Sequence, residues 1–482
     1  MAPMTSENQQ PFTVLIAGGS ITGLTLALLL SRAGINYVVL ERGSSLAPQL
    51  GASLGLHPPA LSILDQLGLW ENDLEPIVAA LHSGQHFTKD GKLFGSARNH
   101  EVVHKQLGYP IVFIERQLYL ETLLKYIPEE HKQTCIHTNA GVADVKQDDN
   151  SVTVTTTDGR TFHGDVLIGG DGVHSMVREL MNPALKEEYI SEFNCIFGIS
   201  NVTEKTPMQA GMVYNVYDSG ISNVCASGVP GKIFWFLFKK NSLTHPPNVP
   251  RFTDADTEKM VEEHGDMPMC ADFTIKDLWE TRDKAVLVAL EEGVISQWID
   301  GRVLLMGDSA HKVTINAGFG GNTAIESTVL FSNSLHKLLQ SSPHPSSAEL
   351  KALFKDFESV QRPRANQILK LSATVTRLEA QNGLMYKLLS RYVMPRLSDK
   401  LKAGVFVDVA VSYPDVEFLP KKASPMQDLR AAIREKKEKA VRGSRLAMLV
   451  KTAVAVGTLA WLVQSKHGIK GLQMVRTLLA EK

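Results

Sequence analysis

Apolar residues form a short run at 12–17, and two glycines follow it directly. Positions 21–33 then repeat apolar residues at helical spacing, and a second short apolar run covers 37–41. A strand, a glycine turn, a helix and a second strand within about thirty residues form the βαβ unit of a doubly wound sheet. The pattern predicts an α/β fold that begins with a Rossmann-like domain.

A second, mainly β region is interleaved with this domain. Alternating residues flank Asp90-Gly91 in the segment 87–94, and we expect a type I′ hairpin there. The runs 152–157 and 161–168 flank another Asp-Gly pair and predict the same arrangement. Strand-like runs also occur between 193 and 240. Substrate chemistry is expected where the β region meets the nucleotide domain.

After residue 322 the pattern becomes helical, with a Pro/Ser-rich loop at 341–347. The predicted organisation is a disordered N-terminus at 1–11, nucleotide-binding parts at 12–80, 106–190 and 296–380, substrate-domain parts at 81–105 and 191–295, and a helical C-terminal region at 381–482.

Composition fits a folded globular body followed by a basic tail. The chain has 482 residues, with 44% hydrophobic and 21% charged residues, which is too apolar for disorder. Its net charge of −1 gives no case for a nucleic-acid partner. Residues 424–482 hold 12 Lys/Arg and 4 Asp/Glu, a surplus of +8, so the preceding residues carry −9.

The four cysteines are widely spaced and form no CxxC pair, so we expect reduced thiols and no zinc site. The first ten residues lack the basic and apolar segments of a secretory signal.

The first glycine turn has the spacing of a dinucleotide-binding motif. Gly18, Gly19 and Gly23 occupy the frame of Gly-x-Gly-x-x-Gly, with Ser20 in place of the second glycine. Such a turn brings backbone N–H groups at a helix N-terminus close to a pyrophosphate. Glu41, at the end of the second strand, can accept hydrogen bonds from ribose hydroxyls and would repel a 2′-phosphate. The motif predicts FAD or NAD rather than NADP; an ordinary tight turn is the alternative.

Two further turns follow the same plan. Gly170-Asp171-Gly172 comes after the apolar strand at 165–169, and Gly307-Asp308 ends a third strand. A glycine-rich segment through Gly321 then leads into a helix, whose N-terminal N–H groups can stabilise negative charge on a reduced flavin. One such motif can be a capped turn, whereas three in this order predict a cofactor site.

With these motifs the sequence resembles the FAD-dependent aromatic hydroxylases and epoxidases of the para-hydroxybenzoate hydroxylase fold, over roughly residues 12–339. Within that family it looks most like the fungal paxilline-type epoxidases of indole-diterpene and meroterpenoid biosynthesis. The local resemblances lie at 18–20, 47–55, 113–117, 195–200, 233–236 and 307–312.

The resemblance implies a role for each matching residue. Glu41 would bind the adenosine ribose, Gly55 would lie by the cofactor, and Arg116 would contact the diphosphate or ribityl region. Asp308 would bind the ribityl chain and Gly321 would lie at the flavin edge. A guanidinium also matches phosphate oxygens on chemical grounds, although Arg116 could instead form an ion pair with Glu115 or Glu121.

Tyr217, in the β region, is the candidate catalytic residue, because a phenol can orient a substrate oxygen or donate a proton to an opening epoxide. A half-buried strand tyrosine is the alternative. Trp235 reads as a core residue that could also line a substrate site. His57, His174 and His311 have no metal-ligand spacing, so we predict satisfied loop or cap histidines and no metal site.

The activity implied by the resemblance is epoxidation of the prenyl chain of a terpenoid or meroterpenoid, with NAD(P)H and O2 as co-substrates. Hydroxylation of a phenolic polyketide ring is one alternative. A flavin-binding protein without oxygenase activity is another, because Ile315 and Phe319 replace the family's usual Pro and Gln beside the flavin.

The C-terminal region suggests a membrane location. A basic stretch at 434–445 precedes the apolar segment 446–464, which is marginal in length for a membrane helix. Residues 386–395 can place an apolar stripe on the same surface. We therefore expect membrane association on the cytoplasmic side, for instance at the endoplasmic reticulum; a tail helix packed on the body is the alternative.

Overall fold

The computed structural model describes residues 11–49 and 53–443. The chain divides into one compact unit that reaches Pro425 and a second that begins at Met426. The predicted disordered N-terminus, except for Pro11, and the apolar segment 446–464 lie outside the described residues. No helix in the described ranges has the length and apolar character needed to cross a membrane.

A six-stranded sheet forms the nucleotide-binding half, in the order β17-β18-β11-β1-β2-β7. Its central strand β1 pairs in parallel with β2 and β11, which confirms the predicted βαβ unit. These strands are short and apolar because both faces of the sheet are covered. The strands are β1 Thr13–Ala17, β2 Asn36–Leu40, β7 Ile136–His137, β11 Val166–Gly169, β17 Ile299–Asp300 and β18 Val303–Leu305.

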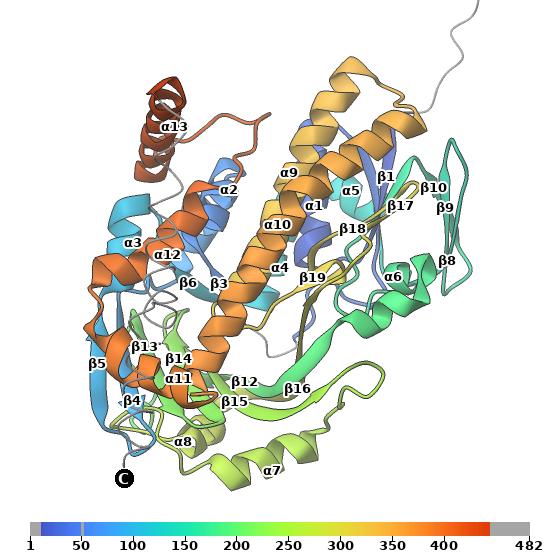
Figure 1. The fold of residues 1–482 in the computed structure, drawn as a ribbon. Coiled ribbons are helices and arrows are strands. Elements are labelled where there is room, and N and C mark those ends of the chain that lie inside the picture. The colour runs from blue at the N-terminus through green and yellow to red at the C-terminus, as the bar shows by residue number, and fades with distance from the viewer. Residues whose placement is uncertain (1–10, 50–52, 444–482) are drawn as a thin grey trace, which may run out of the picture. The chain divides into compact units, whose positions relative to one another are not determined.

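Helices cover this sheet, and one of them reaches the second half of the molecule. The first helix is buried continuously from Thr22 to Leu30 and packs on α9. The long helix α10 packs on α9 and then contacts β13 and β16 of the other sheet (Figure 1). The α-helices of the whole described chain, including those that do not pack on this sheet, are α1 Ile21–Ala33, α2 Pro58–Gln66, α3 Asn99–Leu107, α4 Arg116–Tyr126, α5 Glu129–Thr134, α6 Met176–Met181, α7 Asp254–His264, α8 Ile275–Glu280, α9 Phe319–Ser341, α10 Ser347–Glu379, α11 Leu384–Leu388, α12 Asp399–Val411 and α13 Pro425–Gly443.

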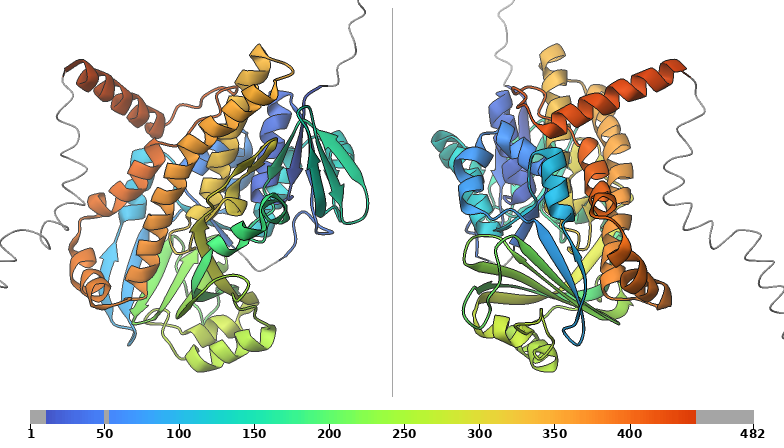
Figure 2. Two further views of the ribbon diagram at one scale, coloured as in Figure 1. Left: turned by 45° about the vertical axis from the view of Figure 1, so that its right-hand side comes forward. Right: turned by 90° about the vertical axis from the view of Figure 1, so that its left-hand side faces the viewer.

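The second half is an eight-stranded sheet in the order β19-β16-β12-β15-β14-β13-β4-β5. The chain enters it in separate passes, so the two halves are interleaved as predicted (Figure 2). Trp235 is fully buried, and its Nε1 donates to Ser200 Oγ at 2.7 Å, so it is a core residue. The strands are β4 Ser83–Thr88, β5 Leu93–Ala97, β12 Ile190–Asn201, β13 Met212–Asp218, β14 Ile221–Ser227, β15 Lys232–Thr244, β16 Arg282–Val294 and β19 His311–Lys312.

Two small sheets and several short helical turns complete the described fold. The C-terminal elements α11 and α12 are joined by a π-helical segment at Leu389–Val393 and a 3₁₀ turn at Met394–Arg396. The small sheets contain β8 Val142–Gln147, β9 Val152–Thr156 and β10 Thr161–Gly164, and β3 Ser53–Leu56 with β6 Val112–Glu115. The remaining turns are Trp70–Leu74, Glu75–Ile77, Pro183–Glu188 and Gly307–Ser309.

The α/β fold class with an interleaved β region and C-terminal helices is confirmed, and so are the hairpins around Asp90-Gly91 and Asp158-Gly159. Two details of these hairpins were wrong. A type I′ turn needs positive φ at both central residues, and Gly91 has φ +73° whereas Asp90 does not have positive φ. The second error concerns 161–168, which is split at Asp165. Its first part pairs with β9, and its second part enters the six-stranded sheet beside β1.

Candidate cofactor and substrate site

The first turn is packed so closely that its outer positions require glycine. Gly18 has φ +98°, and a Cβ added to it would lie 2.5 Å from the carbonyl oxygen of Gly170. A Cβ on Gly23 would lie 1.8 Å from the carbonyl oxygen of Gly18. Because both neighbours are backbone atoms, no side chain can move aside to make room. Glycine at these two positions therefore allows the tight turn between β1 and α1.

The N-terminus of α1 is left open to an anion. Ser20 occupies the N-cap position, but its side chain accepts no hydrogen bond from the helix, and the first turn contains no acidic residue. Instead, Ser20 Oγ accepts a hydrogen bond from Arg116 Nη2 at 2.6 Å. The free N–H groups and the helix dipole therefore face the same region as a guanidinium.

Arg116 is the first residue of α4 and holds an unsatisfied donor. Its Nη1 is buried and has no partner among the described residues. Burial lowers the pKa of Arg116, while the nearby charges of Glu41 and Asp308 oppose that shift. Within the described residues, Glu115 accepts from Gln49 and Glu121 accepts from Gln117. Arg116 instead donates to Ser20 of the glycine turn. An orphaned guanidinium beside an open helix N-terminus fits a diphosphate.

Glu41 is fixed at the end of β2 by two backbone donors. Its carboxylate oxygens accept from Gly19 N and Gly43 N, each at 2.6 Å. Each carboxylate oxygen has a second lone pair, so the group can still accept from ribose hydroxyls. The ribose-binding role of Glu41 stays a prediction.

The Asp171 carboxylate closes the N-terminus of α6. It accepts from Ser175 Oγ at 2.5 Å, from Met176 N at 2.7 Å and from Val177 N at 3.1 Å. Ser309 Oγ adds a fourth hydrogen bond at 3.2 Å. The predicted cofactor role of Asp171 stays a prediction, and the structure shows a capping role for its side chain.

Asp308 lies in the third turn, and side chains that the sequence did not single out hold that turn in place. Arg178 Nη1 donates to Ser309 O at 3.0 Å, and its guanidinium lies 4.9 Å from the centre of the Tyr189 ring. Tyr189 Oη donates to Asp308 O at 2.9 Å. The Asp308 carboxylate is half-buried and forms an ion pair with Lys312. These contacts tie the second and third turns together.

The N-terminus of α9 is open like that of α1. It begins after Gly318, which has φ +67°, and it has neither a side-chain cap nor an acidic residue in its first turn. A Cβ on Gly321 would lie 2.4 Å from Leu54 Cδ1, so Gly321 lets the helix approach β3 closely. The predicted position of Gly321 beside a flavin edge is consistent with this open helix end.

Asn322 joins this helix to β3, and sequence reasoning missed it. Its Nδ2 donates to Gly55 O at 2.8 Å and to Gly318 O at 2.6 Å. Its Oδ1 accepts from His57 N at 2.9 Å. A single buried amide therefore sets the position of Gly55 relative to the glycine-rich segment.

A buried carboxyl group, also missed by the sequence analysis, marks the boundary with the β region. Glu379, at the end of α10, accepts from Asn215 Nδ2 at 3.1 Å and from Asn316 Nδ2 at 2.6 Å. Asn316 lies in the segment before α9, and its Oδ1 accepts from Thr376 Oγ1 at 2.7 Å. Burial raises the pKa of Glu379 to about 7. The carboxyl group thus links the glycine-rich segment to β13.

Uncharged rings form two groups, one among helices and one in the β region. The first group is in contact with the start of α9, and the second lies on β4, β5 and β13. The first group is His57, His100, Phe319 and Phe406, with ring centroids 4.7–6.3 Å apart. The second group is His86, Phe94 and Tyr217, with centroids 5.6–6.2 Å apart. Burial lowers the pKa of His57 to about 3 and those of His86 and His100 to about 4, so these imidazoles are neutral at neutral pH.

Tyr217 is half-buried within the second ring group. Its Oη lies 3.2 Å from His86 Nδ1, and burial raises its pKa well above its usual value. The phenol is therefore protonated at neutral pH and has a neutral imidazole as its partner. The structure places it on the β sheet, as predicted, and its catalytic role stays a prediction.

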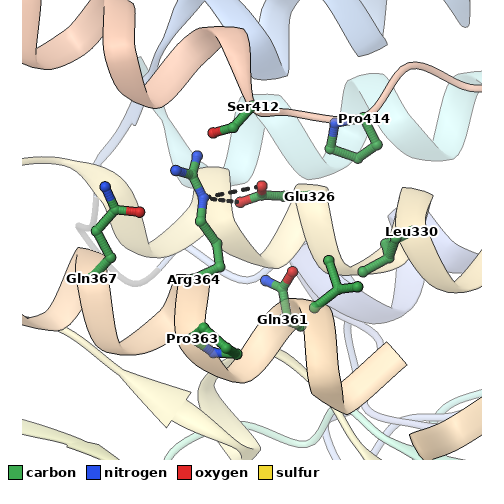
Figure 3. A pocket seen from close by; sticks show the side chains of 9 residues that line it. Glu326, Leu330, Gln361, Pro363, Arg364, Gln367, Ser412 and Pro414 are labelled. Carbon is green, nitrogen blue, oxygen red and sulfur yellow. Dashed lines mark hydrogen bonds and ion pairs between the residues drawn. The ribbon is translucent and has the colours of Figure 1, made fainter. Parts of the chain in front are cut away.

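A cavity of about 310 Å³ lies apart from these groups, between α9, α10 and the end of α12 (Figure 3). Arg364 points across it and donates to both carboxylate oxygens of Glu326, at 3.2 and 3.3 Å. None of the predicted cofactor or catalytic residues lines this cavity.

The three histidines considered above have separate surroundings. His57 is buried at the N-cap of α2, His174 is exposed, and His311 packs on Trp298. His311 Nε2 is buried and finds no partner in the described chain, so the prediction that it is satisfied was wrong. The described residues contain no group of three or more side chains arranged to hold a metal ion.

Comparison with known proteins agrees with this geometry. The FAD binding domain family matches residues 11–370. The FAD-dependent monooxygenase janM of Penicillium janthinellum is 37% identical over 398 residues, which are 81% of this chain and 82% of the relative. The FAD-dependent monooxygenase paxM of Penicillium paxilli is 36% identical over 424 residues, which are 85% of this chain and 87% of the relative.

Solved structures show the same fold at lower identity. HpxO of Klebsiella pneumoniae, complexed with FAD and uric acid, has a TM-score of 0.70 at 17% identity and covers 84% of this chain and 97% of its own. CtdE, in complex with FAD and a substrate, has a TM-score of 0.63 at 18% identity and covers 83% of this chain and 98% of its own. The family match and the sequence relatives place this chain in the family of FAD-dependent monooxygenases.

Proposed function

We propose that this monooxygenase epoxidises an alkene in the prenyl chain of a terpenoid or meroterpenoid intermediate of fungal secondary metabolism, using NAD(P)H and O2. The observation that carries the proposal is the uncharged character of the two ring groups, one at the start of α9 and one on the β sheet. A prenyl chain has no charge to pair, and aromatic faces supply large apolar contact area. The resemblance to paxilline-type epoxidases supports the same substrate class.

In this proposal FAD is held by the open and charged half of the site. The α1 N-terminus and Arg116 would hold the diphosphate, Glu41 the adenosine ribose, and Asp308 the ribityl chain. The α9 N-terminus would lie at the flavin edge. When bound and reduced by NAD(P)H, FAD supplies the oxygen-activating chemistry.

The chain's own residues position the substrate and hold protons. The ring groups exclude water from the reacting alkene, and apolar surroundings strengthen each remaining polar contact. Tyr217 Oη, a neutral phenol in this site, orients a substrate oxygen or donates a hydrogen bond to the product oxygen. Glu379 holds Asn316 and Asn215 in place at the boundary between the two halves.

Hydroxylation of a phenolic ring is the second candidate function. One observation favours it: the guanidinium of Arg391 lies 5.6 Å from the centre of the Phe94 ring, where it could attract a phenolate. A phenolic substrate would then bind more tightly above its own pKa, whereas a prenyl alkene would show no such dependence.

The test is turnover by the purified full-length chain. Flavin absorption bands at roughly 370 and 450 nm, followed by NADPH oxidation and incorporation of one oxygen atom from ¹⁸O₂ into a farnesylated or geranylgeranylated aromatic, are expected. Oxygen on the aromatic ring rather than the prenyl chain would favour the hydroxylase. Flavin bands without any oxygenated product from either substrate class would support the binding-only alternative and overturn the proposal.

Tyr217→Phe sharpens the same experiment. Loss of the phenol is expected to lower kcat about tenfold to a hundredfold, because a positioned proton donor contributes on that order. FAD affinity should stay at the wild-type value, since Tyr217 lies in the ring group on the β sheet. An unchanged kcat would remove Tyr217 from the reaction.

A further inference from the structure

Exposed apolar side chains are concentrated in the segment 384–405. Fourteen large hydrophobic residues are exposed in the described chain, and eight of them lie in this segment. Leu384 is 73% exposed and Tyr392 is 57% exposed. Neighbouring exposed apolar side chains of this kind are typical of an interaction surface. The eight, named here the outer apolar face, are Leu384, Met385, Leu388, Tyr392, Val393, Met394, Leu401 and Val405.

Basic side chains surround the outer apolar face. The segment contains five Lys or Arg residues and a single acidic residue, Asp399. Four of the five basic side chains are exposed. The five are Lys387, Arg391, Arg396, Lys400 and Lys402. An apolar strip with cations at its borders matches an interface in which hydrocarbon lies below anionic headgroups.

The opposite side of the segment is fixed to the body of the protein. Ser390 and Ala403 are buried, and Pro395 packs on Gly95 of β5. Arg391 covers Phe94 of the second ring group, and α12 packs on α3. These elements run beside β4 and β5 (Figure 1). One layer of helical turns therefore separates the outer apolar face from the ring of Phe94.

We propose that the outer apolar face docks the enzyme on the surface of an anionic lipid bilayer. A second copy of this chain is a poorer occupant, because a symmetric contact would bring the same basic border against itself. In a bilayer each basic side chain instead meets negative headgroups, and the apolar side chains enter the boundary of the acyl chains.

The position of the face suggests what docking achieves. If the proposed function holds, the prenylated substrate partitions into the bilayer, and the docked face brings the second ring group next to that reservoir. This consequence rests on the proposed function, whereas the docking itself does not.

The test is a site-specific probe on the full-length chain. Leu388→Cys and the control Val360→Cys, also an exposed apolar position but on α10, are each labelled with an environment-sensitive fluorophore in a Cys135→Ser background. The other three cysteines are buried. Vesicles of phosphatidylcholine with phosphatidylserine should shift the emission of the probe at 388 to shorter wavelength and leave the probe at 360 unchanged. Vesicles of phosphatidylcholine alone should give a weaker response.

Paired charge substitutions complete the design. Leu388→Glu with Leu401→Glu should lower vesicle binding about tenfold, because two leucines leave the interface and two negative charges approach it. Turnover of a water-soluble, short-chain substrate should stay at the wild-type rate in this variant, so a failure of docking is distinguished from a failure of the proposed function. Val360→Glu is the matched control and should leave vesicle binding unchanged.

Two outcomes would overturn the proposal. In the first, the chain binds vesicles while the probe at 388 does not respond, so that another part of the chain makes the contact. In the second, the probe responds to rising protein concentration without lipid, which would identify a second copy as the occupant.

Discussion

The two halves of the candidate site differ in how they treat charge. On the cofactor side, the charges of Glu41 and Asp308 act on Arg116, and the α1 and α9 N-termini are left without side-chain caps. On the substrate side, burial keeps three imidazoles and the Tyr217 phenol neutral, and it favours the protonated form of Glu379. One half is prepared for a charged ligand, and the other for an uncharged one.

Several helices elsewhere in the described chain close their N-termini with side chains, although α2, α4 and α11 begin without a side-chain cap or a first-turn acid, as α1 and α9 do. The helices α7, α8 and α10 each begin with a capping box, in which a Thr or Ser side chain and an acidic side chain satisfy the first N–H groups. The chain therefore has the means to close a helix end, and at α1 and α9 it does not. At α1 and α9 a bound anion would supply the missing acceptors.

Gly23→Ala should have the largest effect on the cofactor side. Its Cβ would lie 1.8 Å from Gly18 O, a backbone atom, so the turn must move. We expect the free energy of unfolding to fall by about 3 kcal/mol and FAD binding to be lost. Urea unfolding and flavin absorbance measure both. The control Gly404→Ala, where no atom lies within 4 Å of the new Cβ, should be neutral or slightly stabilising.

Arg116→Ala should weaken FAD binding about tenfold to a hundredfold, because a charge-assisted hydrogen bond contributes about 1.5–3 kcal/mol. The FAD affinity of Arg116→Lys should lie between those of Arg116→Ala and the wild type, since an ammonium group keeps the charge but cannot form the two parallel hydrogen bonds of a guanidinium. Titration of the apoprotein with FAD, followed by flavin fluorescence, measures the affinity. Arg98→Ala, at a largely exposed ion pair, is the control, and an equal loss there would remove Arg116 from the diphosphate site.

These contrasts also separate what the sequence could predict from what it could not. The first turn was predictable because Gly18, Gly23 and Glu41 act within one βαβ unit, where spacing alone sets the geometry. The open end of α9 was also anticipated from its glycines. The Asn322 contact to His57 joins residues 265 positions apart, and the Asn215–Glu379 contact spans 164 positions. No local pattern reports such pairs, and an isolated Asn or Glu in a helix reads as a surface residue.

The substrate side predicts a pH effect through Glu379. Its pKa of about 7 in the folded chain exceeds the ordinary value of 4.5, so between these values the folded state holds a proton that the unfolded state has lost. Stability should therefore fall as the pH rises through this window, and Glu379→Gln, which has no proton to lose, should not show that fall. We expect the difference in unfolding free energy between the two proteins to change by about 1–3 kcal/mol across the window.

Urea unfolding at several pH values measures this difference. Glu258→Gln, at an exposed position of α7, is the control and should follow the wild type at each pH. A wild-type profile parallel to that of Glu379→Gln would mean that the carboxyl group is ionised throughout, and the substrate side would then contain a buried charge.

Asp171→Asn should have the smallest effect on FAD and is the sharpest test of where the cofactor side ends. The Asp171 carboxylate caps α6, so we expect a loss of about 1 kcal/mol in unfolding free energy. FAD affinity should change by less than about threefold, since that carboxylate already has four partners within the chain. Asp256→Asn removes the corresponding carboxylate at the N-terminus of α7 and is the matched control. If Asp171→Asn weakens FAD binding as strongly as Arg116→Ala, the second turn binds the cofactor directly. The N-terminus of α6 is then part of the cofactor site, together with the N-termini of α1 and α9.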